Sequence, residues 1–104
     1  MGKQLKNARH LDFVRQKPCC ICGKVGVEAH HLLKPWNGSR GMAMKAGDQN
    51  TVPLCPEHHR ALHQAGNEEK FFLQVKGDQD YGKMIARRLW YVSPYYKEQE
   101  REKR

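Results

Sequence analysis

The histidines and cysteines of this chain gather in three short segments, and these residue types are the usual ligands of zinc and related metals. The sequence holds six histidines and four cysteines. The segments are Cys19-Cys20-Ile21-Cys22, His30-His31 and the stretch from Cys55 to His63, and only His10 stands apart. A closed zinc site takes four ligands, so one site cannot use them all. The clustering predicts two metal sites, one closed and one open, a division that is typical of an enzyme.

The first predicted site is a structural zinc centre built from two pairs of residues. Cys19 and Cys22 have the spacing of a zinc knuckle. Cys55 and His58 have the same spacing and would complete a Cys3His tetrahedron. Cys20 is interpreted as a small buried hydrophobic residue. Because a structural zinc ion contributes folding free energy directly, we expect the fold to depend on it.

The second predicted site uses imidazoles alone. His59 and His63 lie four residues apart, so a helix presents both to one cation. Exposed histidines at this spacing are common, but the adjacent pair His30-His31 strengthens the prediction. Neighbouring residues of an extended strand point to opposite faces, so one of this pair can bind a metal while the other takes part in chemistry. Three histidine ligands, an open coordination position and a free imidazole indicate a catalytic site.

The elements that must position these residues begin with a predicted hairpin. A first strand is expected over residues 25–29, leading into the histidine pair, and a second over residues 51–54. Residues 34–50 form the long loop between them, with Trp36 as a possible anchor. Loops of this length in compact domains are usually functional or disordered.

Three helices are predicted to follow. The first begins at Pro56 and stops at Gly66, and the second has Asn67 as its N-cap and ends at Gly77. The third starts at Asp78 or Asp80 and stops before Pro94. Its expected buried stripe consists of Tyr81, Met84, Ile85, Leu89 and Trp90.

Composition limits the class of protein. A chain of 104 residues is one domain, and its hydrophobic content of 38% is low enough that the core needs a staple. No apolar run is long enough to span a membrane and no secretory segment follows Met1, so we expect a cytoplasmic protein without a membrane partner. Thiols stay reduced in that compartment, which favours metal ligands over disulfides.

The charge balance points to a polyanionic partner. The chain has 19 Lys and Arg residues against 11 Asp and Glu residues, a net charge of +8. A small chain with this balance favours nucleic acid, although a solvated basic surface is the alternative interpretation.

Together the motifs resemble the HNH endonucleases, which have the ββα-metal (His-Me finger) fold. The resemblance rests on Glu28-Ala29-His30-His31-Leu32, on Asn50 before Val52-Pro53-Leu54-Cys55, and on His58-His59-x-x-x-His63. The interleaved Cys-x-x-Cys and Cys-x-x-His pairs resemble the zinc-stapled branch of that family. The stretch from Pro53 to Arg60, with Leu62-His63 and Gly66-Asn67-Glu68, is similar to phage and prophage recombination-enhancement (Ref-like) nucleases.

The resemblance covers roughly residues 18–77 and implies a fold. That fold is a small α+β ββα-metal domain with a structural zinc and additional C-terminal helices. The expected organisation is a basic N-terminal arm over residues 1–10, a zinc-stapled HNH nuclease domain over residues 11–94 and a charged tail over residues 95–104.

The resemblance also implies an activity and roles for named residues. The activity is metal-dependent hydrolysis of DNA by an endonuclease or nickase, leaving 5′ phosphate and 3′ hydroxyl ends. His31 would be the general base, a role that suits an imidazole with an ordinary pKa near 6.5. Asn50 would tie down the long loop and hold His31 in place. The ligands of one catalytic divalent cation would be His30, His59 and His63.

The catalytic cation and the partners are expectations of the same kind. The cation would be Mg²⁺, Mn²⁺, Ni²⁺ or Zn²⁺, and imidazoles suit zinc, nickel or manganese better than magnesium. DNA would be the partner, together with a recombination protein suggested by the Ref-like resemblance. The basic residues expected to contact DNA are Lys34, Arg40 and Lys45 on the loop and Arg60 on the helix.

Two other functions remain open at this point. One is a non-catalytic zinc-stapled module that binds nucleic acid, in which His30, His31 and His63 are incidental. The other is a zinc-stapled protein-interaction domain whose basic surface contacts an acidic partner. Catalysis requires His31, whereas folding and DNA binding should survive without it.

Overall fold

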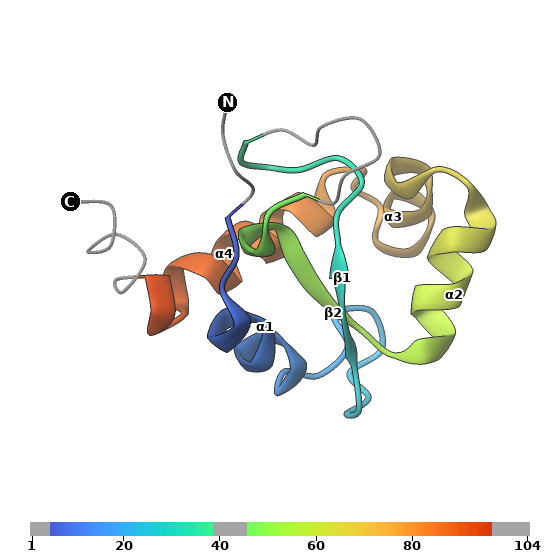
Figure 1. The fold of residues 1–104 in the computed structure, drawn as a ribbon. Coiled ribbons are helices and arrows are strands. Elements are labelled where there is room, and N and C mark those ends of the chain that lie inside the picture. The colour runs from blue at the N-terminus through green and yellow to red at the C-terminus, as the bar shows by residue number, and fades with distance from the viewer. Residues whose placement is uncertain (1–4, 39–45, 97–104) are drawn as a thin grey trace.

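The protein is a small α+β domain with a two-stranded sheet at its centre. The computed structural model describes residues 5–38 and 46–96, and it contains four α-helices, two strands and one 3₁₀ helix, η1, in those ranges. In chain order these are α1 (Ala8–Arg15), β1 (Glu28–His31), η1 (Asp48–Asn50), β2 (Thr51–Leu54), α2 (Pro56–Ala65), α3 (Glu68–Lys76) and α4 (Tyr81–Val92). Figure 1 shows α2 and α3 on one side of the hairpin and α1 and α4 on the other.

β1 and β2 form the expected antiparallel hairpin. The second strand lies where it was predicted. The first was expected over residues 25–29 but begins at Glu28. Gly26 adopts a left-handed φ of 82°, which turns the chain before the strand can start. The pair His30-His31 therefore lies inside the strand, where its two side chains face opposite ways.

The N-terminal segment differs from the basic arm expected over residues 1–10. Helix α1 begins at Ala8, and the side chain of Asn7 caps it by accepting a hydrogen bond from the backbone N–H of His10 at 3.0 Å. The His10 ring is fully buried and packs edge-on against Trp90 of α4, with ring centroids 4.8 Å apart. The last residues of the supposed arm are thus part of the packed domain.

The boundaries of the other helices agree with their capping residues. Pro56 occupies the first turn of α2, and the helix ends at Gly66, whose φ is 71°. The side chain of Asn67 caps α3 by accepting from the backbone N–H of Lys70 at 2.9 Å, and Gly77 ends the helix with φ 76°. The start of α4 near Asp80 is also confirmed.

The buried face of α4 differs from the predicted stripe. Gly82, Ala86 and Trp90 are the buried residues of this helix, whereas Met84 is 43% exposed. The reason is close packing, because a side chain at Gly82 would lie 2.5 Å from the fully buried ring of Phe72. The prediction is therefore confirmed in part, because Trp90 is buried and Tyr81 and Ile85 pack against the core, whereas Met84 is exposed and Gly82 takes a place in the buried face.

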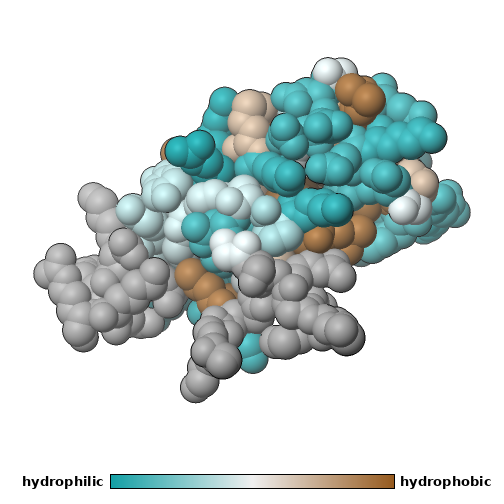
Figure 2. All heavy atoms as spheres, turned by 90° about the horizontal axis from the view of Figure 1, so that it is seen from above, coloured by the Kyte–Doolittle hydropathy of each residue, from teal (hydrophilic) through white to brown (hydrophobic). Residues whose placement is uncertain are grey.

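The core includes two of the four predicted zinc ligands, Cys19 and Cys55. Its largest fully buried hydrophobic residues are Leu32, Leu54, Leu62 and Phe72, and the sulfur-bearing residues Cys19 and Cys55 belong to the same cluster. The outer face drawn in Figure 2 is largely hydrophilic over the described residues. None of the helices in the described ranges has the length and apolar character that crossing a bilayer requires.

Candidate metal centres

The four residues predicted to bind structural zinc meet in the structure. The ligand atoms of Cys19, Cys22, Cys55 and His58 all lie within 4.8 Å of one another. The Cys22 and Cys55 sulfurs are 3.9 Å apart, and His58 Nδ1 lies 3.3 Å from the Cys55 sulfur and 3.8 Å from the Cys19 sulfur. Bonds of about 2.3 Å to zinc at tetrahedral angles place two sulfurs about 3.8 Å apart. The cluster can therefore hold a metal ion.

The two halves of this cluster are joined through β2. The knuckle turn closes through a 2.9 Å hydrogen bond from the Gly23 N–H to the Cys19 carbonyl. The Cys20 N–H donates to the carbonyl of Pro53 at 3.0 Å, which fixes the knuckle against β2. Cys55 follows β2 directly as the N-cap of α2. The strand thus positions both ligand pairs.

Thiol acidity distinguishes Cys19 from its neighbour Cys20. Burial opposes ionisation of Cys19, but hydrogen bonds from the backbone of Cys55, Cys22 and Ile21 outweigh it and lower the Cys19 pKa to about 6. Burial raises the pKa of Cys20 to about 12. Because a metal ligand is a thiolate, the Cys20 thiol is unsuited to coordination, and it also lies outside the cluster.

The second cluster joins β1 to α2. The ligand nitrogens of His30, His59 and His63 also lie within 4.8 Å of one another. His30 is buried at 3% exposure, whereas His63 is exposed, so the trio runs from the protein interior to its surface. His30 Nδ1 lies 3.2 Å from His59 Nε2. The structure thus brings the three predicted ligands of a catalytic cation together.

Carboxylates on the far side of two of these rings set which nitrogen carries the proton. His30 Nε2 donates to Glu68 at 2.8 Å, and His59 Nδ1 donates to Glu28 at 2.6 Å. Burial also lowers the pKa of His30, against the opposing effect of Glu68, so this ring stays neutral. A metal ion would use the lone pairs of His30 Nδ1 and His59 Nε2, the nitrogens that face away from the two carboxylates. Carboxylates behind metal-binding imidazoles are the usual arrangement, so the donor set fits a metal ion.

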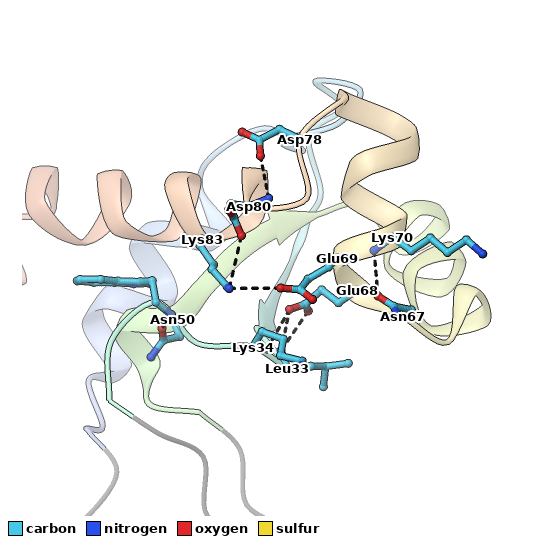
Figure 3. Close-up of polar contacts among 11 residues, drawn as sticks. Leu33, Lys34, Asn50, Asn67, Glu68, Glu69, Lys70, Asp78, Asp80 and Lys83 are labelled. Carbon is cyan, nitrogen blue, oxygen red and sulfur yellow. Dashed lines mark hydrogen bonds and ion pairs between the residues drawn. The ribbon is translucent and has the colours of Figure 1, made fainter.

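Glu68 is a buried partner of the histidine cluster to which the sequence analysis gave no role. Its side chain is 4% exposed. It accepts a hydrogen bond from His30 at 2.8 Å. It also accepts from the backbone N–H groups of Leu33 and Lys34 at 3.0–3.1 Å, as Figure 3 shows. Burial opposes its ionisation, but these bonds lower its pKa. No spacing rule links Glu68 to a residue 38 positions earlier, so the sequence offered no signal for this contact.

His31 faces away from the trio and has its own carboxylate partner. His31 Nε2 donates to Asp48 at 2.8 Å, and Asp48 also accepts from the backbone N–H of Asn7 at 2.7 Å. Burial opposes ionisation of Asp48, but these two bonds lower its pKa. His31 Nδ1 forms no hydrogen bond with any described residue, and the side chain is 19% exposed. Sequence reasoning also missed Asp48, which lies in the loop far from His31 in sequence.

Asn50 makes the backbone hydrogen bonds that were expected of it. Its side-chain oxygen accepts from the N–H groups of Trp36 at 2.8 Å and Asn37 at 3.2 Å, and its amide donates to the Asn37 carbonyl at 2.9 Å. Its own carbonyl accepts from the Leu32 N–H at 2.8 Å, and the next residue, Thr51, pairs with His31. Asn50 therefore joins the start of the loop to the end of β1.

The predicted DNA-contacting residues are only partly described. Arg60 is exposed on α2, and Lys34 is exposed beside β1. Arg40 and Lys45 lie outside the described residues.

The fold and the two clusters define a small α+β protein with candidate metal centres. Residues 2–84 match a family described as "Protein of unknown function (DUF968)", and the chain belongs to that family. It is similar to "Uncharacterized protein YdfU" of Escherichia coli (strain K12), with 38% identity over 55 residues. The similar region is 53% of this chain but only 15% of that relative. No solved structure matches the chain.

Proposed function

We propose that the protein is a metal-dependent DNA endonuclease or nickase of the HNH (ββα-metal) type, stapled by a structural zinc ion. The main support is the arrangement of histidines on one strand-strand-helix unit. Three imidazoles have their ligand atoms within 4.8 Å of one another, and two of them are backed by carboxylates. A fourth imidazole, His31, lies on the opposite face of β1 and is paired with Asp48. This is a ligand set with a separate base.

The proposed reaction assigns the proton transfer to His31. Because His31 Nε2 donates to Asp48, the lone pair is on Nδ1, which takes a proton from the attacking water. The Asp48 carboxylate stabilises the imidazolium that forms. The water oxygen bonds to phosphorus, the bond from phosphorus to the 3′ oxygen breaks, and that oxygen takes a proton from solvent water to become the 3′ hydroxyl. The products carry 5′ phosphate and 3′ hydroxyl ends.

Other residues bind and orient the substrate. A divalent cation held by His30, His59 and His63 would supply Lewis-acid stabilisation of the charge on the phosphate. Arg60, exposed on the same helix as two of these ligands, would clamp the phosphate. Asn50 would keep the loop and the end of β1 in register. The resemblance to Ref-like nucleases further suggests recombination intermediates as substrates and a recombination protein as partner.

The test is nicking of supercoiled plasmid by the purified, zinc-loaded protein with added Mg²⁺, Mn²⁺ or Ni²⁺. We expect metal-dependent nicking that falls by about 10²–10⁴-fold in His31→Ala, the range for loss of a general base. The control variant is Gln64→Ala, exposed on α2 and outside both clusters, which should nick like the wild type. Circular dichroism and zinc content check that both variants are folded.

The alternative function has its own outcome. A wild-type protein that binds DNA but cleaves none under any of these ions would contradict the nuclease. It would favour a zinc-stapled module that binds nucleic acid without catalysis.

A further inference from the structure

A groove along α4, which contains none of the residues of the two metal-ligand clusters, has the composition of a ligand site. It measures about 420 Å³, within the range of pockets that hold small organic molecules. Its lining residues are Trp36 from the loop after β1 and five residues of α4 and its start: Asp80, Lys83, Met84, Arg87 and Tyr91.

Two aromatic side chains form one wall of this groove. The rings of Trp36 and Tyr91 have centroids 5.8 Å apart at an interplanar angle of 55°, and Tyr91 is 50% exposed. Both N–H groups of Trp36 are hydrogen-bonded, because its backbone N–H donates to Asn50 and its indole N–H donates to the Gln49 carbonyl at 2.8 Å. Tyr96 packs on Tyr91 with centroids 4.8 Å apart. The wall is therefore a pre-ordered aromatic surface that is partly open to solvent.

Among the described residues, one of the two cations of the groove has carboxylate partners and the other has none. Lys83 Nζ lies 3.5 Å from a carboxylate oxygen of Glu69 and 3.5 Å from one of Asp80, as Figure 3 shows. Arg87 is exposed and forms no ion pair with any residue in the described ranges. An arginine that pairs with no carboxylate of the described residues, beside one partly exposed and one exposed aromatic ring, suits a phosphate next to a planar base.

Trp36 on one side of the groove and α3 on the other each contact the strand that carries His30 and His31, directly or through a neighbouring residue. Trp36 is bound to Asn50, which also accepts from the residue after His31. Lys83 is paired with Glu69, and the preceding residue in α3, Glu68, binds His30. The groove is thus bordered by Asn50 and by α3, which also contact the end of β1 and His30.

We infer that this groove binds an unpaired nucleotide, with its base against Trp36 and Tyr91 and its phosphate on Arg87. This inference rests on the proposed nuclease function. It specifies the substrate of the nuclease as DNA with unpaired bases. Every base has a face that can stack on an aromatic ring, but in a duplex these faces are covered by neighbouring pairs. The net charge of +8 agrees with a polyanionic ligand.

The test is fluorescence anisotropy with labelled single-stranded oligothymidylate and, for comparison, a labelled hairpin duplex. The protein carries one zinc ion per chain and no further divalent cation is added, so that the histidine site stays empty and binding is measured without cleavage. We expect tighter binding of the single strand, weakened on the order of tenfold by Tyr91→Ala and restored by Tyr91→Phe, because stacking contributes about that factor or more per base.

Two neighbouring arginines provide the matched control. Arg87→Ala and Arg88→Ala remove the same charge from exposed positions of α4, but only Arg87 lines the groove. We expect the Arg87 variant to weaken single-strand binding several-fold more than the Arg88 variant. Equal losses in both variants, or Tyr91→Ala binding like the wild type, would overturn the inference.

The outcome separates this inference from the nuclease. If plasmid is nicked but the groove variants bind single strands normally, the proposed groove is wrong and the proposed nuclease activity is supported. If the groove variants lose single-strand binding but no DNA is cleaved, the groove is supported and the nuclease activity is contradicted.

Discussion

At the scale of single residues, the carboxylate of Glu68 is the contact that most constrains the histidine cluster. Its two oxygens accept from the His30 ring and from two backbone N–H groups of the segment after β1. An amide offers only one accepting oxygen, so it cannot satisfy all of these donors. The orientation of His30 therefore depends on the charge of residue 68 as well as on its shape.

Replacing Glu68 by Gln should weaken metal binding at the histidine cluster about 10–100-fold, the usual effect of losing a partner of a metal-bound histidine. Isothermal titration of the zinc-stapled protein with Co²⁺ measures this affinity. The matched control is Glu69→Gln, since this neighbouring carboxylate faces Lys83 and not the histidines. Equal affinity in the Glu68 variant and the wild type would show that Glu68 does not orient His30.

The ligands could be predicted from the sequence, but their partners could not. Short spacings such as Cys19 to Cys22 bring ligands together through local structure alone. Glu68 and Asp48 reach their histidines only through the tertiary fold, and carboxylates occur throughout the chain, so residue type gives no signal. That His30 and His31 face opposite sides of β1 was predictable, because successive side chains of a strand alternate.

At the scale of the elements, local capping chemistry set most boundaries and packing set the faces. Pro56, Gly66 and Asn67 marked the helix ends in advance because their backbone preferences are local. Helix α1 was missed although Asn7 is a good N-cap, because residues 1–10 are polar and basic and were interpreted as an arm. Its burial against Trp90 is a contact with the other end of the chain.

Gly82→Ala should destabilise the packing of α4 on α3. The added methyl group would meet the Phe72 ring at 2.5 Å, and this ring is fully buried. Overpacking costs about 1–3 kcal/mol, and better helix propensity offsets up to about 1 kcal/mol of that. Urea unfolding of the zinc-loaded protein should show a net loss of about 1–2 kcal/mol. The exposed substitution Arg88→Ala should change stability by less than about 0.5 kcal/mol.

At the scale of the whole molecule, the buried ring of His10 couples folding to pH. Neither of its ring nitrogens has a hydrogen-bond partner among the described residues. Burial lowers its pKa to about 4, although the nearby Asp48 pulls it upwards. The unfolded chain therefore binds more protons than the folded protein between pH 4 and 6.5, so stability falls as pH falls through that range.

Substituting His10 by Leu should remove this part of the pH dependence. At about pH 5.5 the unfolded-state protonation of one histidine favours unfolding by about 1.4 kcal/mol relative to neutral pH. The loss of unfolding free energy between about pH 7.5 and pH 5.5 should be smaller in His10→Leu by that amount. Denaturant titrations of both proteins at the two pH values measure it, and parallel losses would contradict the assignment.

Adjacent histidines of α2 belong to different metal-ligand clusters. His58 turns to the cysteines and its neighbour His59 turns to the other histidines, so one helical turn serves both clusters. On the proposed assignment, loss of the structural zinc would disturb the orientation of His59 as well as the fold around the cysteines. Zinc starvation would therefore stop the nuclease even when its catalytic cation is plentiful. A surplus of zinc would instead fill both places. The concentration of zinc alone would thus decide whether neither cluster, one cluster or both clusters hold a metal ion.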